Sequence, residues 1–332
     1  MNAKVTKVKY VPAHDYNDSL LVVNFKGKSI NQSIVNAIRR AAITNLPIYA
    51  FSRTLITIHK NTSAWTNDVL SLRLSQIPIS GVKTGFSYLP SVYWKNADFD
   101  DKARLRHEKD NNEIEFYLNV TNDTKEKMLV TTNHLQFYIN GKKKTMNEKY
   151  PSLLIKLKPK QTVSASGHAV LATCELHELY TATKRAFHTY KDDTIDKESG
   201  DSHDITLRLE SAGQLDEFEI LERACEYLTI RLKIIKETVA NESNRLEISQ
   251  SKKLIQKLDN ETNTIGLIIG DQLQDDPDVE KAGIVRKDLL TRNIEFYIET
   301  KTKNPLKNFY SAIDKNIKLL NHLKNEIKKL KK

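Results

Sequence analysis

The sequence is poor in the residues that build several common kinds of functional site. Among 332 residues there are two cysteines, Cys174 and Cys225, and ten glycines. Two cysteines do not make a disulfide framework, so we expect a reducing compartment. Neither a phosphate-cradling glycine loop nor a serine-centred nucleophile motif is present. No apolar run reaches 18 residues, and the first residues lack the apolar segment of a secretory signal, so we expect no contact with a membrane.

The paired cysteines and histidines of structural zinc sites are also lacking. One cysteine and three unevenly spaced histidines (His168, Cys174, His177 and His188) fit the usual four-ligand pattern poorly. The acidic run at 275–278 contains a proline and is typical of a turn. We therefore expect no metal and no other cofactor. A hydrolase that uses Cys174 as nucleophile and His177 as base stays open as an alternative.

Basic residues are abundant: the chain has 52 lysines and arginines and 42 acidic residues, for a net charge of +10. With 39% hydrophobic and 28% charged residues, the chain is typical of a folded protein with a basic surface. Three lysines, 142–144, follow an Asn-Gly turn, and the last five residues hold four more. Either group could contact phosphate, although neither is interleaved with aromatic residues. A stand-alone basic nucleic-acid-binding protein is therefore the main alternative function.

An imperfect internal repeat organises the chain. The first copy has a strand at 19–25, a short helix from Ile30 that ends before Pro47, a strand at 53–59, and an alternating strand at 205–209. A long amphipathic helix follows, with apolar residues spaced three or four apart. That apolar stripe consists of Phe218, Leu221, Cys225, Leu228, Leu232, Ile235 and Val239.

The second copy repeats this order at the C-terminus. It has a strand at 255–258, a short helix at 265–273, a strand at 294–298 and a final helix that begins at Pro305. The final helix carries a stripe of its own: Phe309, Ile313, Ile317, Leu320, Leu323, Ile327 and Leu330.

A helix with one wide apolar stripe needs a partner, and two such units can cover each other. We therefore predict an α+β fold of two units paired by pseudo-two-fold symmetry; two independent α+β domains are the alternative. Short alternating segments and the Asn140-Gly141 hairpin signal predict a β-rich insert. The predicted boundaries are 1–80 and 204–240 for the first unit, 81–203 for the insert and its return loop, 241–251 for a linker, and 252–332 for the second unit.

Several segments resemble alpha-like RNA polymerase subunits: the bacterial alpha N-terminal domain, the archaeal D subunit and the third subunit of eukaryotic polymerase II. Residues 36–40 (NAIRR), followed by Asn-Leu-Pro at 45–47, resemble the first-helix signature of that family. Residues 67–79 resemble the segment that ends in R-L-x-x-I-P, with Leu72 in place of the usual histidine. Residues 158–177 resemble the close of the family's inserted domain.

The C-terminal part resembles the small partner subunit, of the archaeal L or eukaryotic eleventh-subunit type. Residues 263–266 (NTIG) stand where that family has H-T-L-G, and 276–283 (DPDVEKAG) match D-P-x-V-x-x-A-G. Asn263 and Gly270 replace the family's histidine and arginine. Two partner subunits in one chain resemble the arrangement in the polymerases of large cytoplasmic DNA viruses.

The resemblance implies a non-catalytic subunit of a multisubunit DNA-directed RNA polymerase, which nucleates assembly of the two large catalytic subunits. It further implies contacts with other small subunits, only indirect contact with DNA, one intramolecular pseudo-heterodimer per complex, and a place in the host cytoplasm, the viral factory or the virion. We expect Asn36, Arg39, Arg40 and Arg73 to contact a large subunit. The expected intramolecular interface consists of Ile34, Ile38, Leu221, Cys225, Leu228, Leu232, Ile265, Ile269, Ile313, Ile317, Leu320 and Ile327.

Overall fold

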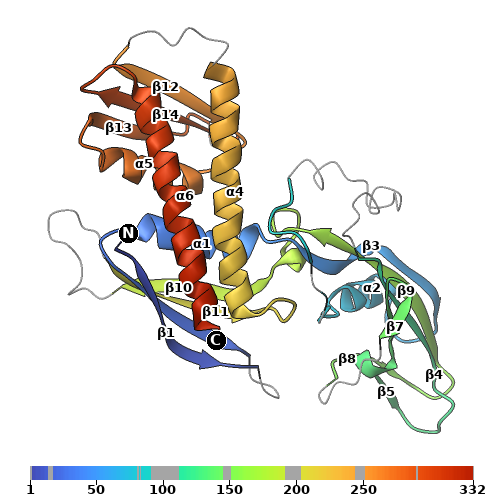
Figure 1. The fold of residues 1–332 in the computed structure, drawn as a ribbon. Helices are drawn as coiled ribbons and strands as arrows, with labels where there is room; N and C mark the ends of the chain where they lie inside the picture. Colours follow the sequence, from blue (N-terminus) through green and yellow to red (C-terminus); the bar gives the residue numbers. More distant parts are fainter. Residues whose placement is uncertain are drawn as a thin grey trace.

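A computed structural model describes residues 2–13, 18–80, 82, 84–90, 112–144, 151–190, 203–243, 251–288 and 291–331. It is a mixed α+β structure in two lobes (Figure 1). In one lobe, two long helices lie side by side, with a sheet toward each end. The other lobe is β-rich. In the described part of the chain, no helix is both long and apolar enough to cross a bilayer.

The first sheet is antiparallel, with strand order β1-β2-β11-β10. Its strands are β1 (Lys4–Val11), β2 (Leu20–Lys26), β10 (Thr183–Tyr190) and β11 (Asp204–Ser211). Helix α1 (Gln32–Thr44) begins where the Asn31 side chain accepts a hydrogen bond from the Ile34 N–H. Helix α4 (Glu217–Ser243) covers the same face of the sheet as α1.

The C-terminal half, residues 252–332, forms a three-stranded sheet in the order β12-β14-β13. Its elements are β12 (Lys253–Asp259), α5 (Asn263–Gln274), β13 (Val279–Val285), β14 (Asn293–Thr300) and α6 (Pro305–Leu330). Strand β13 was not predicted, because its residues alternate weakly in hydrophobicity and Gly283 interrupts the pattern.

The β-rich lobe holds a five-stranded sheet in the order β3-β9-β4-β6-β7 and a β5-β8 pair. Asn140 and Gly141 both have positive φ, 52° and 73°, so the predicted β6–β7 hairpin turn is confirmed. The elements of this lobe are β3 (Ile48–Asn61), α2 (Asn67–Ser75), β4 (Ile114–Thr121), β5 (Met128–Thr131), η2 (Thr132–His134), β6 (Gln136–Ile139), β7 (Lys142–Lys144), β8 (Leu153–Leu157), β9 (Thr162–Ala172) and the connecting turn η3 (Glu178–Tyr180).

The structure places several predicted boundaries differently. Strand β10 lies in the first sheet, although 183–190 fell inside the predicted insert. Conversely, β3 and α2 pack in the β-rich lobe, which therefore begins well before residue 81. The cause is the length of β3: Ile48 faces the first core, whereas Phe51 and Ile56 of the same strand face the second. Helix α4 also runs to Ser243, beyond the predicted start of the linker at 241, and most of the predicted return loop lies outside the described residues.

Two hydrophobic cores hold the described chain together. The second core belongs to the β-rich lobe and is centred on Phe51, Phe116 and Phe137, whose rings meet edge to face. The first core is continuous from Ala3 to Ile327 and contains residues of both halves. The alternative of two independent domains, each covering its own helix, is therefore wrong for this structure.

Candidate functional site

The central feature of the molecule is the junction at which the C-terminal half meets the N-terminal half, residues 1–243. Helices α4 and α6 lie along each other, and the end of α6 reaches strand β1 (Figure 1). Two ion pairs join α4 to α6: Lys236–Asp314 at 2.7 Å and Lys324–Glu226 at 2.9 Å. A third, Lys331–Asp216 at 2.6 Å, joins the C-cap residue of α6 to the turn before α4.

The predicted interface residues come together in the first core. From α1, α4, α5 and α6, the fully or nearly buried members are Ile34, Ile38, Leu221, Cys225, Leu228, Leu232, Ile265, Ile269, Ile313, Leu320 and Ile327. Ile317 is only half-buried and packs at the edge of this core. The stripe on α6 drifts away from Ile317 because a straight α-helix turns slightly less per residue than a heptad spacing assumes, and Asn316 takes the buried position instead.

Polar contacts inside the junction fix how the two halves meet. The Asn31 amide donates to the Asp271 carboxylate at 2.8 Å, which joins the start of α1 to α5. The buried Asn316 amide donates to the Ile268 carbonyl at 2.7 Å. Burying a polar side chain costs free energy unless it is hydrogen-bonded, so each contact disfavours a shifted arrangement.

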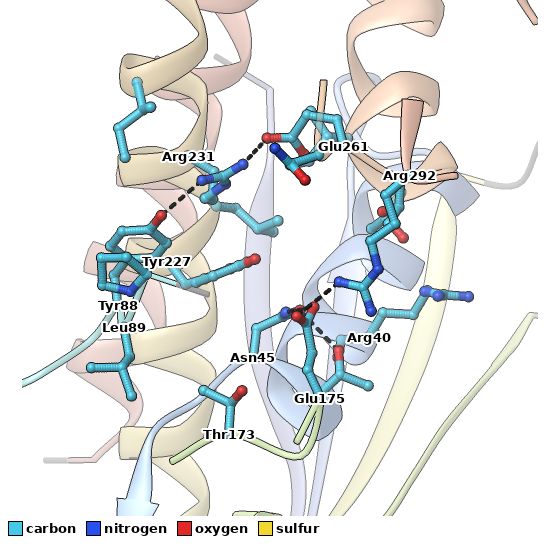
Figure 2. Close-up of a pocket in the computed structure, with 18 of the residues that line it drawn as sticks. Arg40, Asn45, Tyr88, Leu89, Thr173, Glu175, Tyr227, Arg231, Glu261 and Arg292 are labelled. Atoms are coloured by element: carbon cyan, nitrogen blue, oxygen red, sulfur yellow. Dashed lines mark hydrogen bonds and ion pairs between the residues drawn. The ribbon is translucent and has the colours of Figure 1, made fainter. Parts of the chain in front are cut away.

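A polar cavity of about 440 Å³ opens at this junction, between α1, α4, the start of α5, and the segments at 88–90 and 173–175. We call it the seam pocket. Arg231 and Glu261 form an ion pair on its wall, and the Arg231 guanidinium also donates to the Tyr88 hydroxyl at 2.7 Å. Figure 2 shows this group on one side of the cavity.

A second charged group lies on the other side of the seam pocket (Figure 2). The Glu175 carboxylate accepts hydrogen bonds from the Asn45 amide at 2.8 Å and from the Arg292 guanidinium at 2.9 Å. Three parts of the chain, α1, the end of the insert and the β13–β14 connection, thus meet at one carboxylate.

Burial changes the acid–base properties of the pocket wall. It raises the pKa of the Glu261 carboxyl and raises the pKa of the Tyr227 hydroxyl far above its usual range. Tyr227 therefore stays protonated and able to donate a hydrogen bond at physiological pH.

The structure brings Asn36, Arg39 and Arg40 together on α1. The Asn36 side-chain oxygen accepts from Arg39 Nε at 3.1 Å and Nη2 at 2.8 Å, so it orients that guanidinium. Burial and the nearby Arg40 charge lower the pKa of Arg39. Arg40 is exposed, and its guanidinium makes no hydrogen bond or ion pair with any described residue.

Arg73 lies elsewhere, on α2 of the β-rich lobe. Its guanidinium donates to the Leu153 carbonyl at 2.8 Å and stands 5.5 Å from the centre of the Trp65 ring. The structure therefore does not gather all four predicted contact residues on one surface. Within this chain, Arg73 ties α2 to β8.

The histidines and cysteines considered as a metal or hydrolase site are dispersed. His168 pairs with Glu115 at 2.9 Å, and the His177 ring accepts a hydrogen bond from the Leu179 N–H at 3.0 Å. Burial, with Glu178 and Glu175 nearby, raises the pKa of the Cys174 thiol, which is the opposite of what an activated nucleophile needs. Among the described residues, no group of three or more His, Cys, Asp or Glu is placed to hold a metal ion.

The lysines at 142–144 form strand β7, at the edge of the five-stranded sheet. Lys142 and Lys143 are exposed, whereas the Lys144 ammonium donates to the Ser80 carbonyl at 2.7 Å. Charged lysines on an edge strand also hinder pairing with other chains.

Comparison with known proteins connects this architecture to one family. The model of the RNA polymerase Rpb3/Rpb11 dimerisation domain matches residues 24–232, which include α1, the β-rich lobe and most of α4. The chain belongs to this family. A DNA directed RNA polymerase subunit by name, R470 of Acanthamoeba polyphaga mimivirus, is 26% identical over 299 residues, with 83% of this chain and 81% of the relative covered. The predicted resemblance to alpha-like subunits and to a viral relative is confirmed.

The residues of the seam pocket were not predicted from the sequence. Arg231 and Glu261 are 30 positions apart, and Glu175 and Arg292 are 117 apart, so no local spacing connects them. One feature of the sequence did point to such a pair: Arg231 lies next to the apolar stripe of α4. A charge at a buried position needs a partner of opposite charge.

Proposed function

We propose that this chain is a non-catalytic assembly subunit of a multisubunit DNA-directed RNA polymerase, in which two alpha-like partners are fused. The N-terminal half would be the larger partner, with the β-rich lobe inserted in it. Residues 252–332 would be the smaller partner, paired with the first about a pseudo-two-fold axis. Such a subunit would nucleate binding of the two large catalytic subunits, as one copy per complex.

The observation that carries this proposal is the shared first core, in which α6 of the C-terminal half covers the stripe of α4. Leu228 and Leu232 of α4, and Leu320 and Leu323 of α6, are 0–1% exposed. A half on its own would expose these side chains to water. Fusion makes their meeting intramolecular, which fixes the stoichiometry at one to one.

The face of α1 that carries Asn36, Arg39 and Arg40 supports a contact with a large subunit. Asn36 orients Arg39, and beside it Arg40 presents a guanidinium that no residue in the described part of the chain pairs with. Planar guanidinium groups suit carboxylates and backbone carbonyls at protein interfaces. Arg73 is exposed, although its guanidinium donates to the Leu153 carbonyl. For Arg73 we propose a second contact with a large subunit, separate from that of α1.

The proposal extends to partners and place of action. Contacts with other small polymerase subunits, only indirect contact with DNA, and work in the host cytoplasm, the viral factory or the virion are in keeping with the family and with the viral relative.

The experiment is to tag the chain in its native setting, purify it in moderate salt, and identify the co-purified proteins by mass spectrometry. Two large polymerase subunits in near-equal amounts are the expected result. A chain that emerges alone, or with nuclease-sensitive nucleic acid only, would contradict the proposal and favour a nucleic-acid-binding protein that uses Lys142 and Lys143.

A further inference from the structure

Large apolar side chains are exposed on helix α2, on the segment before it and on the β5-β8 pair. These elements belong to the β-rich lobe and lie apart from the two long helices (Figure 1). The side chains are between 36% and 54% exposed: Trp65, Val69, Leu72, Leu129 and Leu153. Single apolar residues are normal on a protein surface, whereas a group of them indicates a binding site for another molecule. We call these five residues the α2 surface.

Helical spacing aligns one part of the α2 surface. Leu72 and Arg73 follow Val69 by three and four positions on α2, so all three share one face of the helix. Trp65 precedes the helix on the same side, because the Arg73 guanidinium stands 5.5 Å from the centre of its ring. The same guanidinium donates to the Leu153 carbonyl at 2.8 Å, which brings β8 beside this face.

Strand pairing aligns the other part. Val130 of β5 and Ile155 of β8 lie opposite each other and are both buried. Side chains alternate along a strand, so the next pair, Leu129 and Lys156, points outward. Leu153 is exposed on the same pair of strands. The two strands therefore present two leucines and a lysine to solvent beside α2.

A hollow of about 240 Å³ lies where the helix meets the strands. Its walls include Trp65, Arg73, Leu153 and Lys156. Among the described residues, no acidic side chain lines it. The hollow is thus part apolar and part cationic, and it is open at the surface.

The tryptophan at this hollow is exposed but held in place. The Asn61 amide donates to the Trp65 carbonyl at 2.9 Å, and the Trp65 N–H donates to the Ser63 hydroxyl at 3.2 Å. Arg73 stacks on its ring from the helix. A side chain that is already fixed loses little freedom when a partner binds. Tryptophan and arginine are also the residues that most often carry the binding energy of protein interfaces.

Charge on the α2 surface is unevenly distributed. The Lys156 ammonium makes no ion pair with any described residue, and the Arg73 guanidinium has donors beyond the one that the Leu153 carbonyl accepts. Asp68, the acidic residue of α2, is turned about 140° around the helix from Arg73, beyond Leu72. A carboxylate of a partner therefore fits beside Arg73 and Lys156.

We propose that the α2 surface docks a segment of a large polymerase subunit in which an apolar or aromatic side chain stands next to a carboxylate. The apolar side chain enters the hollow between Trp65 and Leu153, and the carboxylate pairs with Lys156 and the spare donors of Arg73. Apolar burial supplies affinity, and the charge pair fixes the orientation of the segment. This partner is the second contact inferred for Arg73, and its identity rests on the proposed function.

Photo-crosslinking from Leu72 tests which molecule covers the surface. A crosslinking phenylalanine derivative replaces Leu72 in the tagged chain in its native setting, and the crosslinked peptides are identified by mass spectrometry. We expect one segment of a large subunit, with an aromatic or large aliphatic residue close in sequence to Asp or Glu. The same derivative at Leu267 of α5 is the matched control, because Leu267 is 45% exposed and Leu72 is 46% exposed. It should not crosslink to that segment.

Several results of the crosslinking would overturn the proposal. They are a crosslink to a second copy of this chain, to nucleic acid, or to a segment that lacks Asp and Glu, and crosslinking no stronger from Leu72 than from Leu267.

A synthetic peptide of the crosslinked segment then tests the apolar contact, by fluorescence anisotropy with the intact chain. Trp65→Ala and Leu72→Ser should each raise the dissociation constant about tenfold, because each removes part of the apolar surface. Leu72 is exposed, so Leu72→Ser should melt like the original chain and show that lost binding is not lost folding. Leu267→Ser is the control and should bind the peptide normally. Unchanged binding by both α2 variants would contradict the proposal.

Lys156→Gln isolates the charge pair. It should weaken binding of the peptide about fivefold, but it should have no effect on a peptide with Asn or Gln in place of its acidic residue. Equal weakening of both peptides, or of neither, would contradict the pairing.

The crosslinking also separates this inference from the proposed function. A chain that purifies without large subunits would contradict the proposed function. A chain that purifies with both of them, but crosslinks from Leu72 to neither, would overturn this inference alone.

Discussion

Arg231 of α4 and Glu261, which precedes α5, form an ion pair across the junction of the two halves. Their side chains are only 17% and 6% exposed. The same guanidinium donates to the Tyr88 hydroxyl, so one arginine joins the long helix to two other segments. A buried charge is tolerated because its partner and its hydrogen bonds replace water.

Glu261→Gln should therefore destabilise the chain, because it leaves the Arg231 charge buried without a counter-charge. We expect a loss of about 3 kcal/mol in the free energy of unfolding, measured by urea denaturation. Lys253→Gln, which breaks the exposed Lys253–Glu299 pair, is the control and should change stability by less than about 1 kcal/mol. Equal effects of the two changes would contradict a special role for the buried pair.

Two strand glycines offer a matched test of packing. A Cβ at Gly167 of β9 would stand 2.4 Å from the Phe116 ring, which is itself fixed against Phe51 at a centroid distance of 4.9 Å. Gly167→Ala should therefore cost about 1–3 kcal/mol by overpacking the second core. At Gly283 of β13 a Cβ would meet nothing within 4 Å, so Gly283→Ala should be neutral or slightly stabilising in the same denaturation experiment.

Alkaline pH should destabilise the junction. Burial raises the pKa of the Cys225 thiol from 9.0 to about 12 and that of the Tyr180 hydroxyl from 10.0 to about 12. Both groups favour the fold in their neutral forms, so their contribution is complete below the unfolded-state pKa and is lost as pH rises through the folded value. For Cys225 alone, the free energy of unfolding should fall by about 3 kcal/mol between pH 8 and pH 11.

The measurement is urea denaturation at a series of pH values, with Cys225→Ala as the comparison. That variant should be less stable at pH 8, because it leaves a small cavity, but should lose less stability as pH rises. Identical pH dependence in the two proteins would contradict a buried, neutral thiol at the α4–α6 interface.

Charge reversal on α1 tests the proposed contact with a large subunit. Arg39→Glu combined with Arg40→Glu should reduce recovery of a large subunit at least tenfold in a tagged purification, because two guanidinium groups become repulsive. Arg40→Glu alone should change the melting temperature of the isolated chain little, since Arg40 is exposed, and should still reduce recovery; Arg39 is half-buried, so the double variant is compared with this single change. Arg53→Glu is the control; if it reduces recovery equally, general surface charge rather than this face of α1 is responsible.

Local sequence patterns predicted single helices, strands and turns better than they predicted which of these elements pack together. The stripe of α4 was predicted from Phe218 to Val239, and those residues are buried in the observed helix, because burial of one helical face imposes that spacing. The Asn140-Gly141 turn was likewise predictable, because only a few residues adopt positive φ readily.

Long-range pairing could not be predicted in the same way. The alternation in β3 marks a strand without saying which sheet it joins, and β3 contributes to both cores. The predicted boundaries of the insert therefore differ from those of the β-rich lobe. The seam pocket depends on pairs such as Arg292 and Glu175, 117 positions apart, whose contact exists only once the two halves have met.

Division of the chain within the linker tests the central claim, that the two halves are partners in one dimer-like fold. Residues 1–246 and 249–332 would be produced separately and together, and examined by size-exclusion chromatography and circular dichroism. Together, they should form a one-to-one complex with the helical content of the intact chain, and either fragment alone should aggregate or be poorly folded, because α4 and α6 each expose an apolar stripe. Two fragments that are each folded and monomeric, and that do not bind each other, would contradict the claim.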